Sequence, residues 1–210
     1  MFAELKIKDF LEKVASSDPT PGGGSVAAMN VASACSCALL MANVTLGKEK
    51  FVTVQNEVQK VVLELEEIKR DSLVLMDRDR EAYDAVVAAF KMKKDTDAEK
   101  EARKKAIFKA NLVATEVPIR ISETALRAQK IILRLTEIGN RNAISDSLTG
   151  LFTAYAGSIS SIGVAKLNLA GTWADPETKA NLITKVKALE AETEASLEGI
   201  RKTMTANLPL

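Results

Sequence analysis

An acidic side chain interrupts an apolar helical stripe near the middle of this 210-residue chain. Asp79 falls on that stripe between Leu75 and Ala82. A carboxylate among apolar neighbours must find polar partners or raise its pKa, and a carboxylic acid with a raised pKa can act as a general acid near neutral pH. Asp79 is therefore a candidate for proton transfer, and a structural acid bonded to a neighbouring helix is the alternative. Tyr83, one helical turn later, could bond to Asp79 or to a ligand.

A glycine-rich turn comes before the second helical pattern. It reads Pro19-Thr20-Pro21-Gly22-Gly23-Gly24-Ser25. Glycines let backbone N–H groups line a concave turn, and the N-terminus of the following helix adds about half a positive charge. The turn is therefore a candidate site for an anion or a carbonyl oxygen, although it lacks the lysine and the spacing of a Walker phosphate loop. A flexible connector with Ser25 as a helix cap is the alternative.

Further polar groups come before the fifth helical pattern and at the ends of other helices. Asn142, Ser145 and Asp146 stand at the start of an apolar helix. They would either cap that helix and complement its dipole, or present Asp146 to a cleft beside the glycine turn. Lysines cluster at other helix ends, at positions 48, 50, 91, 93 and 94. Such lysines are usually solvated, but they could also attract an acidic tail on a substrate.

The composition excludes several kinds of chemistry. The chain has no histidine, so it has no Ser-His-Asp or Cys-His relay, no histidine-bound zinc and no imidazole base. Its 29 basic and 28 acidic side chains nearly balance, which argues against a nucleic-acid binder. Cys35 and Cys37 cannot complete a zinc site and are expected to be reduced core thiols. Reduced thiols, together with a charged N-terminus that lacks a signal-peptide pattern, predict a cytoplasmic protein.

Apolar residues recur at helical spacing along almost the whole chain. This pattern predicts an all-α bundle of about six helices, several of them long, in a single domain over residues 1–210. The expected helical segments are residues 2–16, the glycine turn to about 46, about 50–90, 97–138, a start near 142–145 to about 169, and 176 onward. Thr96 and Glu99 form a capping-box pattern, Gly139 is a stop signal, and Asp175 is a cap. Pro118 should kink the fourth helix.

Two helical stretches carry no charged side chain: residues 19–47 and residues 147–165. Each is long enough to raise a transmembrane alternative, but small polar residues and glycine are frequent in both and large apolar residues are sparse. Burial on every side explains an uncharged helix better, which places these two at the centre of the bundle. Because six helices enclose two central ones incompletely, we also expect a subunit interface and no membrane.

Taken in order, these features resemble the formiminotetrahydrofolate cyclodeaminase family, which includes stand-alone methenyltetrahydrofolate cyclohydrolases. The resemblance covers essentially the whole chain. It is carried by residues 19–28, 41–48, 77–83, 142–146 and 166–169. It implies an orthogonal, all-helical bundle that forms a homodimer, with a folate site near the subunit interface.

The resemblance also implies a lyase of histidine degradation and one-carbon metabolism. In this reaction N10 of 5-formiminotetrahydrofolate attacks the formimino carbon and ammonia leaves, giving 5,10-methenyltetrahydrofolate without metal or cofactor. Asp79, Asp146 and Ser145 would be catalytic. The implied binding residues are Pro21, Gly22, Gly23, Gly24, Ser25, Asn43, Tyr83, Asn142 and Asn168, with Lys48, Lys93 and Lys94 for the tail of a polyglutamylated substrate. A cyclohydrolase and a non-catalytic folate-binding helical module are the alternatives.

Overall fold

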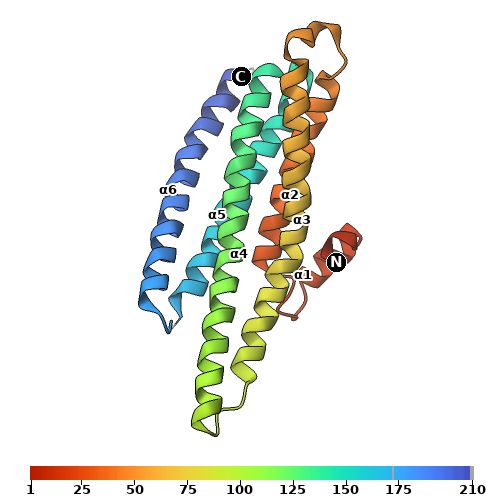
Figure 1. The fold of residues 1–210 in the computed structure, drawn as a ribbon. Coiled ribbons are helices and arrows are strands. Elements are labelled where there is room, and N and C mark those ends of the chain that lie inside the picture. Colours follow the sequence, from red (N-terminus) through yellow and green to blue (C-terminus); the bar gives the residue numbers. More distant parts are fainter. Residues whose placement is uncertain (172, 209–210) are drawn as a thin grey trace.

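The structure, a computed structural model, describes residues 1–171 and 173–208 as a bundle of α-helices (Figure 1). The helices are α1 (Ile7–Val14), α2 (Gly23–Thr45), α3 (Gln55–Lys91), α4 (Asp97–Ile138), α5 (Ile144–Ala170) and α6 (Pro176–Asn207). Short 3₁₀ helices, η1 (Phe2–Glu4), η2 (Glu49–Val54) and η3 (Arg141–Ala143), lie between or before them. Helices α2 to α6 run side by side along the molecule, and α1 lies to one side. The described residues form no strand, which confirms the predicted all-α fold class.

Local signals determine where the helices begin and end. Thr96 Oγ1 accepts the N–H of Glu99, and the Glu99 carboxylate accepts the N–H of Thr96, which closes the predicted capping box of α4. The Asp175 side chain accepts backbone N–H groups from the first turn of α6. Gly139 follows the last residue of α4, as predicted, whereas Pro118 lies within α4 and the helix continues on both sides of it.

The buried face of α3 follows the apolar stripe on which Asp79 falls, with one local departure. The residues of that stripe that are buried are Val58, Val61, Leu65, Ile68, Ser72, Ala82 and Ala89. Between Ser72 and Ala82, Met76 and Asp77 are buried, while Leu75 is only half-buried. The N-terminal segment covers this part of α3, where the Phe2 N–H donates to Asp77 Oδ1 at 3.0 Å.

The two uncharged helices, α2 and α5, occupy the middle of the bundle. Helix α2 packs against α3, α4 and α5, and α5 packs against α2, α4 and α6. Both are long and apolar enough to cross a membrane by length and composition, but 61% and 50% of their most apolar stretches are buried within the bundle. A buried core helix of a soluble protein has this same character.

Small residues let α2 and α5 approach closely, and their contacts show that the two helices are antiparallel. A Cβ added to Gly150 would lie 2.9 Å from the carbonyl oxygen of Ala34, and one added to Gly157 would lie 2.8 Å from Val31 Cγ2. The corresponding position at Gly23 would be 3.8 Å from Val164 Cγ2. Residue numbers therefore rise along α5 as they fall along α2.

Candidate active site

The carboxyl group of Asp79 on α3 lies against the first turn of α2. The Ser25 hydroxyl is 3.0 Å from Asp79 Oδ2 and 3.0 Å from the carbonyl oxygen of Met76. A Cβ added to Gly24 would lie 2.0 Å from Asp79 Oδ1 and 2.5 Å from its Cγ. No side chain fits at position 24 while Asp79 keeps this place. The glycine in the sequence is thus explained by a close approach between a helix end and a carboxyl group.

Burial raises the pKa of Asp79 above its usual value, and this effect outweighs hydrogen bonds from the Ser25 hydroxyl and N–H, which lower it. The Ser25 hydroxyl has one proton and two possible acceptors. When Asp79 is protonated, its own O–H can donate to Ser25 Oγ, and Ser25 can donate to the Met76 carbonyl. The same contacts can therefore accommodate Asp79 with or without its proton.

Asp79 lines a cavity of about 350 Å³, which we call the glycine cleft. The glycine turn forms one wall, and residues of α3, α4 and α5 form the others; among them are Tyr83, Asn111 and Asn168. Gly23 and Gly24 lie in the first helical turn, where backbone N–H groups have no partner within the helix. The cleft thus combines a carboxylic acid, helix N-terminal donors, a phenol and two amides. These groups suit proton transfer to a ligand that is bound through its oxygen and nitrogen atoms.

The structure brings together about half of the residues predicted for the site. The residues that line the glycine cleft are Asp79, Tyr83, Asn168, Gly22, Gly23 and Gly24. The Ser25 hydroxyl bonds to Asp79, and Pro21 is buried within the glycine turn. Asn168 Nδ2 donates to the carbonyl oxygen of Ala114 at 2.6 Å, which ties α5 to α4 at the cleft. Asn111 was not predicted. No local motif marks it, and only the packing of α4 against α5 places it beside Asn168.

The expected cleft holding both Asp79 and Asp146 does not form within one chain. Val164 packs near Gly23, and Asp146 is eighteen residues earlier on α5. At about 1.5 Å per residue, Asp146 therefore lies about 27 Å from the glycine turn. The antiparallel arrangement of α2 and α5 is the physical reason, since it puts the start of α5 at the far end of α2.

Asp146 belongs to a second polar group at that far end, which we call the distal cluster. Its members are Asn43 and Lys48 near the end of α2, and Asn142, Ser145 and Asp146 at the start of α5. Asn140 holds the two segments together, because its backbone N–H donates to Thr45 Oγ1 at 2.9 Å and its Nδ2 donates to the Val44 carbonyl at 3.1 Å. The distal cluster and the glycine cleft thus lie at opposite ends of the α2–α5 pair.

The lysines expected to meet an acidic tail also do not line the glycine cleft. Lys93 and Lys94 are exposed in the loop between α3 and α4, and Lys48 is in the distal cluster. Cations do lie next to the cleft, but they come from the first turns of α4, where Arg103 is one of them. Sequence spacing alone did not identify Arg103, because its position depends on how α4 packs beside the α5–α6 turn.

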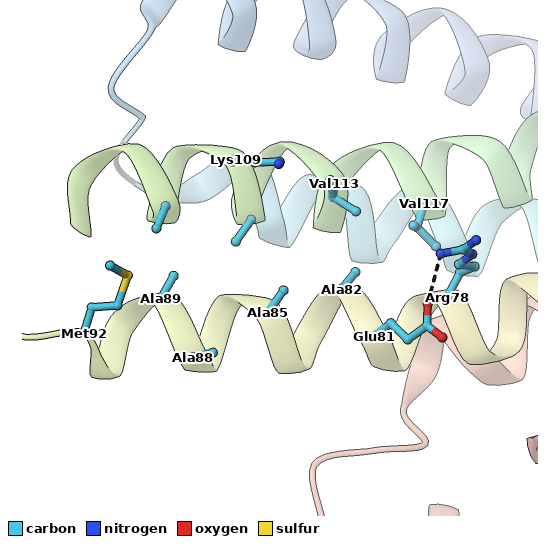
Figure 2. Close-up of a pocket in the computed structure, with 12 residues that line it drawn as sticks. Arg78, Glu81, Ala82, Ala85, Ala88, Ala89, Met92, Lys109, Val113 and Val117 are labelled. Atoms are coloured by element: carbon cyan, nitrogen blue, oxygen red, sulfur yellow. Dashed lines mark hydrogen bonds and ion pairs between the residues drawn. The ribbon is translucent and has the colours of Figure 1, made fainter. Parts of the chain in front are cut away.

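Another hollow, between α3 and α4, is lined mainly by apolar side chains. It is an apolar groove of about 470 Å³ in which alanines of the two helices face each other (Figure 2). Arg78 and Glu81 form an ion pair at its rim, with 3.1 Å between Arg78 Nη1 and Glu81 Oε2. Ala82 borders both this groove and the glycine cleft.

Burial makes both cysteines weak nucleophiles. Burial raises the pKa of the Cys35 thiol to about 12, so it stays protonated, and Cys37 is also a free thiol whose pKa burial raises. Within residues 1–171 and 173–208, no group of three His, Cys, Asp or Glu side chains is placed to hold a metal ion.

Comparisons with known proteins bear on the family and the fold of this chain. The family model for formiminotransferase-cyclodeaminase matches residues 6–188. The methenyltetrahydrofolate cyclohydrolase of Methylorubrum extorquens is 33% identical over 202 residues, which are 96% of this chain and 97% of that protein. The formimidoyltransferase-cyclodeaminase of Sus scrofa is 27% identical over 200 residues, 91% of this chain but only 36% of that protein.

The crystal structure of formiminotetrahydrofolate cyclodeaminase from Thermotoga maritima matches the fold with a TM-score of 0.86 and 26% identity, over 98% of each chain. The bundle therefore has the helical cyclodeaminase fold. With the family model spanning most of its length, the chain belongs to the formiminotransferase-cyclodeaminase family of folate one-carbon enzymes. This finding confirms the resemblance seen in the sequence.

Proposed function

We propose that this protein is a formiminotetrahydrofolate cyclodeaminase, which converts 5-formiminotetrahydrofolate to 5,10-methenyltetrahydrofolate and ammonia. The main support is Asp79, a carboxylic acid with a raised pKa at the wall of the glycine cleft. A nitrogen leaves a tetrahedral carbon as ammonia only after it has been protonated, so a proton donor is what this reaction needs. The family and the full-length structural match supply the folate substrate class.

The proposed reaction moves protons between nitrogens of the substrate. N10 attacks the formimino carbon, the new C–N10 bond forms, and the bond from that carbon to the formimino nitrogen breaks. This nitrogen gains two protons and leaves as ammonia; one is the proton that N10 loses, and the other comes from solvent and leaves the methenyl bridge positively charged. Asp79 would pass protons to the leaving nitrogen, while the N–H groups of Gly23 and Gly24 orient a ring oxygen. We propose that these acid–base steps use no metal or redox cofactor.

Methenyltetrahydrofolate cyclohydrolase is the second candidate, and the 33% identity to such an enzyme over nearly the whole of both chains favours it. In that reaction water adds to the methenyl carbon and the C–N5 bond breaks. The same cleft would serve, because water and ammonia are both too small to need many dedicated contacts.

One experiment on a single preparation separates the two reactions. The purified protein is given 5-formiminotetrahydrofolate, with methenyl absorbance and ammonia followed together, and then 5,10-methenyltetrahydrofolate, with loss of the same absorbance followed. A cyclodeaminase releases ammonia in step with methenyl formation. Loss of the methenyl signal without activity on the formimino compound supports the cyclohydrolase. No turnover of either compound by folded protein overturns both, and leaves a non-catalytic folate-binding module.

We also propose the cellular setting that goes with this reaction. The formimino group would come from histidine degradation, as the family resemblance implies. A cytoplasmic location is supported by Cys35 and Cys37, which are both free thiols, as expected in a reducing compartment.

We further propose a homodimer formed through one uncharged face of α2 and α5. On α2, Val31 and Ala34 face α5, while Ser33 and Leu40 are exposed on the adjacent side of the helix. On α5, Gly150 and Gly157 face α2, while Thr149 and Ser160 are exposed on the adjacent side. Because the two helices are antiparallel, these exposed residues of α2 and α5 lie on the same face of the bundle. Leu40 is 45% exposed, and a shared face of this kind without charge suits a subunit interface.

A two-fold axis perpendicular to α2 and α5 would exchange the two ends of the uncharged face. Leu167, which is 75% exposed, borders both that face and the glycine cleft, so the cleft opens beside the proposed interface. The exchange would place Asp146 of the partner subunit near the cleft that contains Asp79. Asn43, Lys48, Asn142 and Ser145 of the partner subunit would move with it. We propose that a complete site uses both chains, with Asp79 and the partner's Asp146 sharing the proton transfers.

This arrangement predicts complementation between two inactive variants. Asp79→Asn and Asp146→Asn homodimers should each be nearly inactive. Co-expression should give heterodimers in half of the population, and each heterodimer has one site with both aspartates intact. The expected activity is about a quarter of wild type. Differently tagged chains allow the heterodimer to be isolated. A heterodimer as inactive as the two homodimers would exclude a site shared between the two chains, and a monomeric mass by light scattering would exclude the dimer.

A further inference from the structure

Residues 2–22 form an N-terminal arm whose two ends are held by one turn of α3. At the start of the arm, the Phe2 N–H donates to Asp77 Oδ1 at 3.0 Å. At its end, the glycine turn leads into Ser25, whose hydroxyl lies 3.0 Å from Asp79 Oδ2. Asp77 and Asp79 are two residues apart, so a single helical turn contacts both the beginning of the arm and the segment that follows it.

Apolar packing attaches the first part of the arm to the bundle. Phe2 and Phe10 are buried, and their rings meet edge to face with centroids 6.0 Å apart. Both belong to the main hydrophobic core, against which Leu5 and Val14 also pack. The residues that follow Val14 are exposed up to the start of the glycine turn. The course of the glycine turn therefore depends on how firmly the preceding part of the arm is held.

The hydrogen bond at the start of the arm uses only half of a buried carboxyl group. Asp77 is 8% exposed, and within the described part of the chain its Oδ2 is buried without a hydrogen-bond partner. The nearby Arg80 guanidinium lies against the Phe2 ring, 5.3 Å from the ring centre. A buried carboxyl group that is only half satisfied costs folding free energy. Asp77 therefore stabilises the bundle poorly, which indicates that its hydrogen bond serves to place the arm.

We propose that Asp77 is a positioning residue, which fixes the start of the N-terminal arm and thereby keeps the glycine turn in place against Asp79. This inference rests on the proposed function, in which Asp79 passes protons and the turn orients the substrate. Holding both ends of a chain segment restricts the conformations of the residues between them. A catalytic group displaced by about 1 Å can lose about 10²-fold in turnover, so even partial release of the arm should be measurable.

The first test compares turnover with stability. Asp77→Ala removes the acceptor for the Phe2 N–H, so kcat/KM should fall by about tenfold. The midpoint of chemical denaturation should change little, because the half-satisfied carboxyl group is lost as well. Asp77→Asn keeps an acceptor and should restore kcat/KM to within about threefold of wild type. Ile68→Val is the matched control on α3: it removes a buried methylene, so it should lower the midpoint and leave turnover unchanged.

The second test follows the arm directly and needs no substrate. In Asp77→Ala, amide hydrogen exchange over residues 15–25 should become about tenfold faster, while exchange in α6 stays as in wild type. Phe10→Ala weakens the arm without changing α3, so it should give the same pattern together with reduced turnover. Leu11→Ala, on the exposed side of α1, is its matched control and should change neither exchange nor turnover.

Three results would overturn the inference. One is wild-type exchange over residues 15–25 in both Asp77→Ala and Phe10→Ala, whether or not the protein is active. Another is faster exchange with wild-type turnover, because the turn would then not need to be held. The third is a loss of turnover that Asp77→Asn does not restore. Failure of the proposed function looks different: exchange still rises in both variants, which supports the role of the arm, but wild-type protein turns over neither folate compound.

Discussion

Replacing Asp79 with asparagine is expected to lower kcat for ammonia release by about 10²–10⁴-fold while the protein remains folded. The amide has nearly the shape of the carboxyl group, so it can keep its place against Gly24 and its contact with Ser25. It cannot deliver a proton to the leaving nitrogen. Asp84→Asn, an exposed change one turn further along α3, is the matched control and should leave kcat unchanged.

The pH dependence distinguishes an acid from a structural group at position 79. Because burial raises the pKa of Asp79, the folded state holds its proton to higher pH than the unfolded chain does. The free energy of unfolding should therefore fall as pH rises from the ordinary aspartate pKa through the raised one, and this slope should be missing in Asp79→Asn. Wild-type kcat/KM should fall above the same raised pKa. A stable Asp79→Asn protein with wild-type kcat would show that Asp79 is only a structural partner of the first turn of α2.

A methyl group at position 24 should be almost as damaging as loss of the carboxyl group. In Gly24→Ala the added carbon would start 2.0 Å from Asp79 Oδ1, so Asp79 or the first turn of α2 must move. A displacement of about 1 Å of a catalytic group can reduce turnover by about 10²-fold. Overpacking of this kind usually lowers the free energy of unfolding by about 1–3 kcal/mol. Turnover and chemical denaturation measure the two effects.

Two other glycine-to-alanine variants control for the loss of backbone freedom that any such replacement causes. In Gly23→Ala the new carbon would meet only Val164 Cγ2, at 3.8 Å, so the variant should be as stable as wild type or slightly more so. Gly199 on α6 has open space around it, and Gly199→Ala should leave both stability and turnover intact. If Gly24→Ala behaved like Gly199→Ala, the close contact between Gly24 and Asp79 would not matter for function.

The glycine cleft was partly predictable because two of its components sit in motifs with local meaning. A carboxylate on an apolar helical stripe has to lie near a helix neighbour, and the glycine turn opens the next buried helix. That Gly24 and Asp79 touch could not be predicted, because the contact depends on the crossing of α2 and α3. Arg103 gave no signal at all, since a charged residue on α4 is ordinary by itself.

The sequence by itself determined the helical class, the helix ends and the two uncharged central helices. Thr96, Asp175 and Gly139 act through bonds and backbone shapes within a few residues, and the apolar period is a local property as well. Only the tertiary structure decided which polar residues meet. It placed Asp146 about 27 Å from the glycine turn, because two helices can pack in either direction and the antiparallel choice separates the start of α5 from the start of α2. Spacing along a chain does not encode that choice.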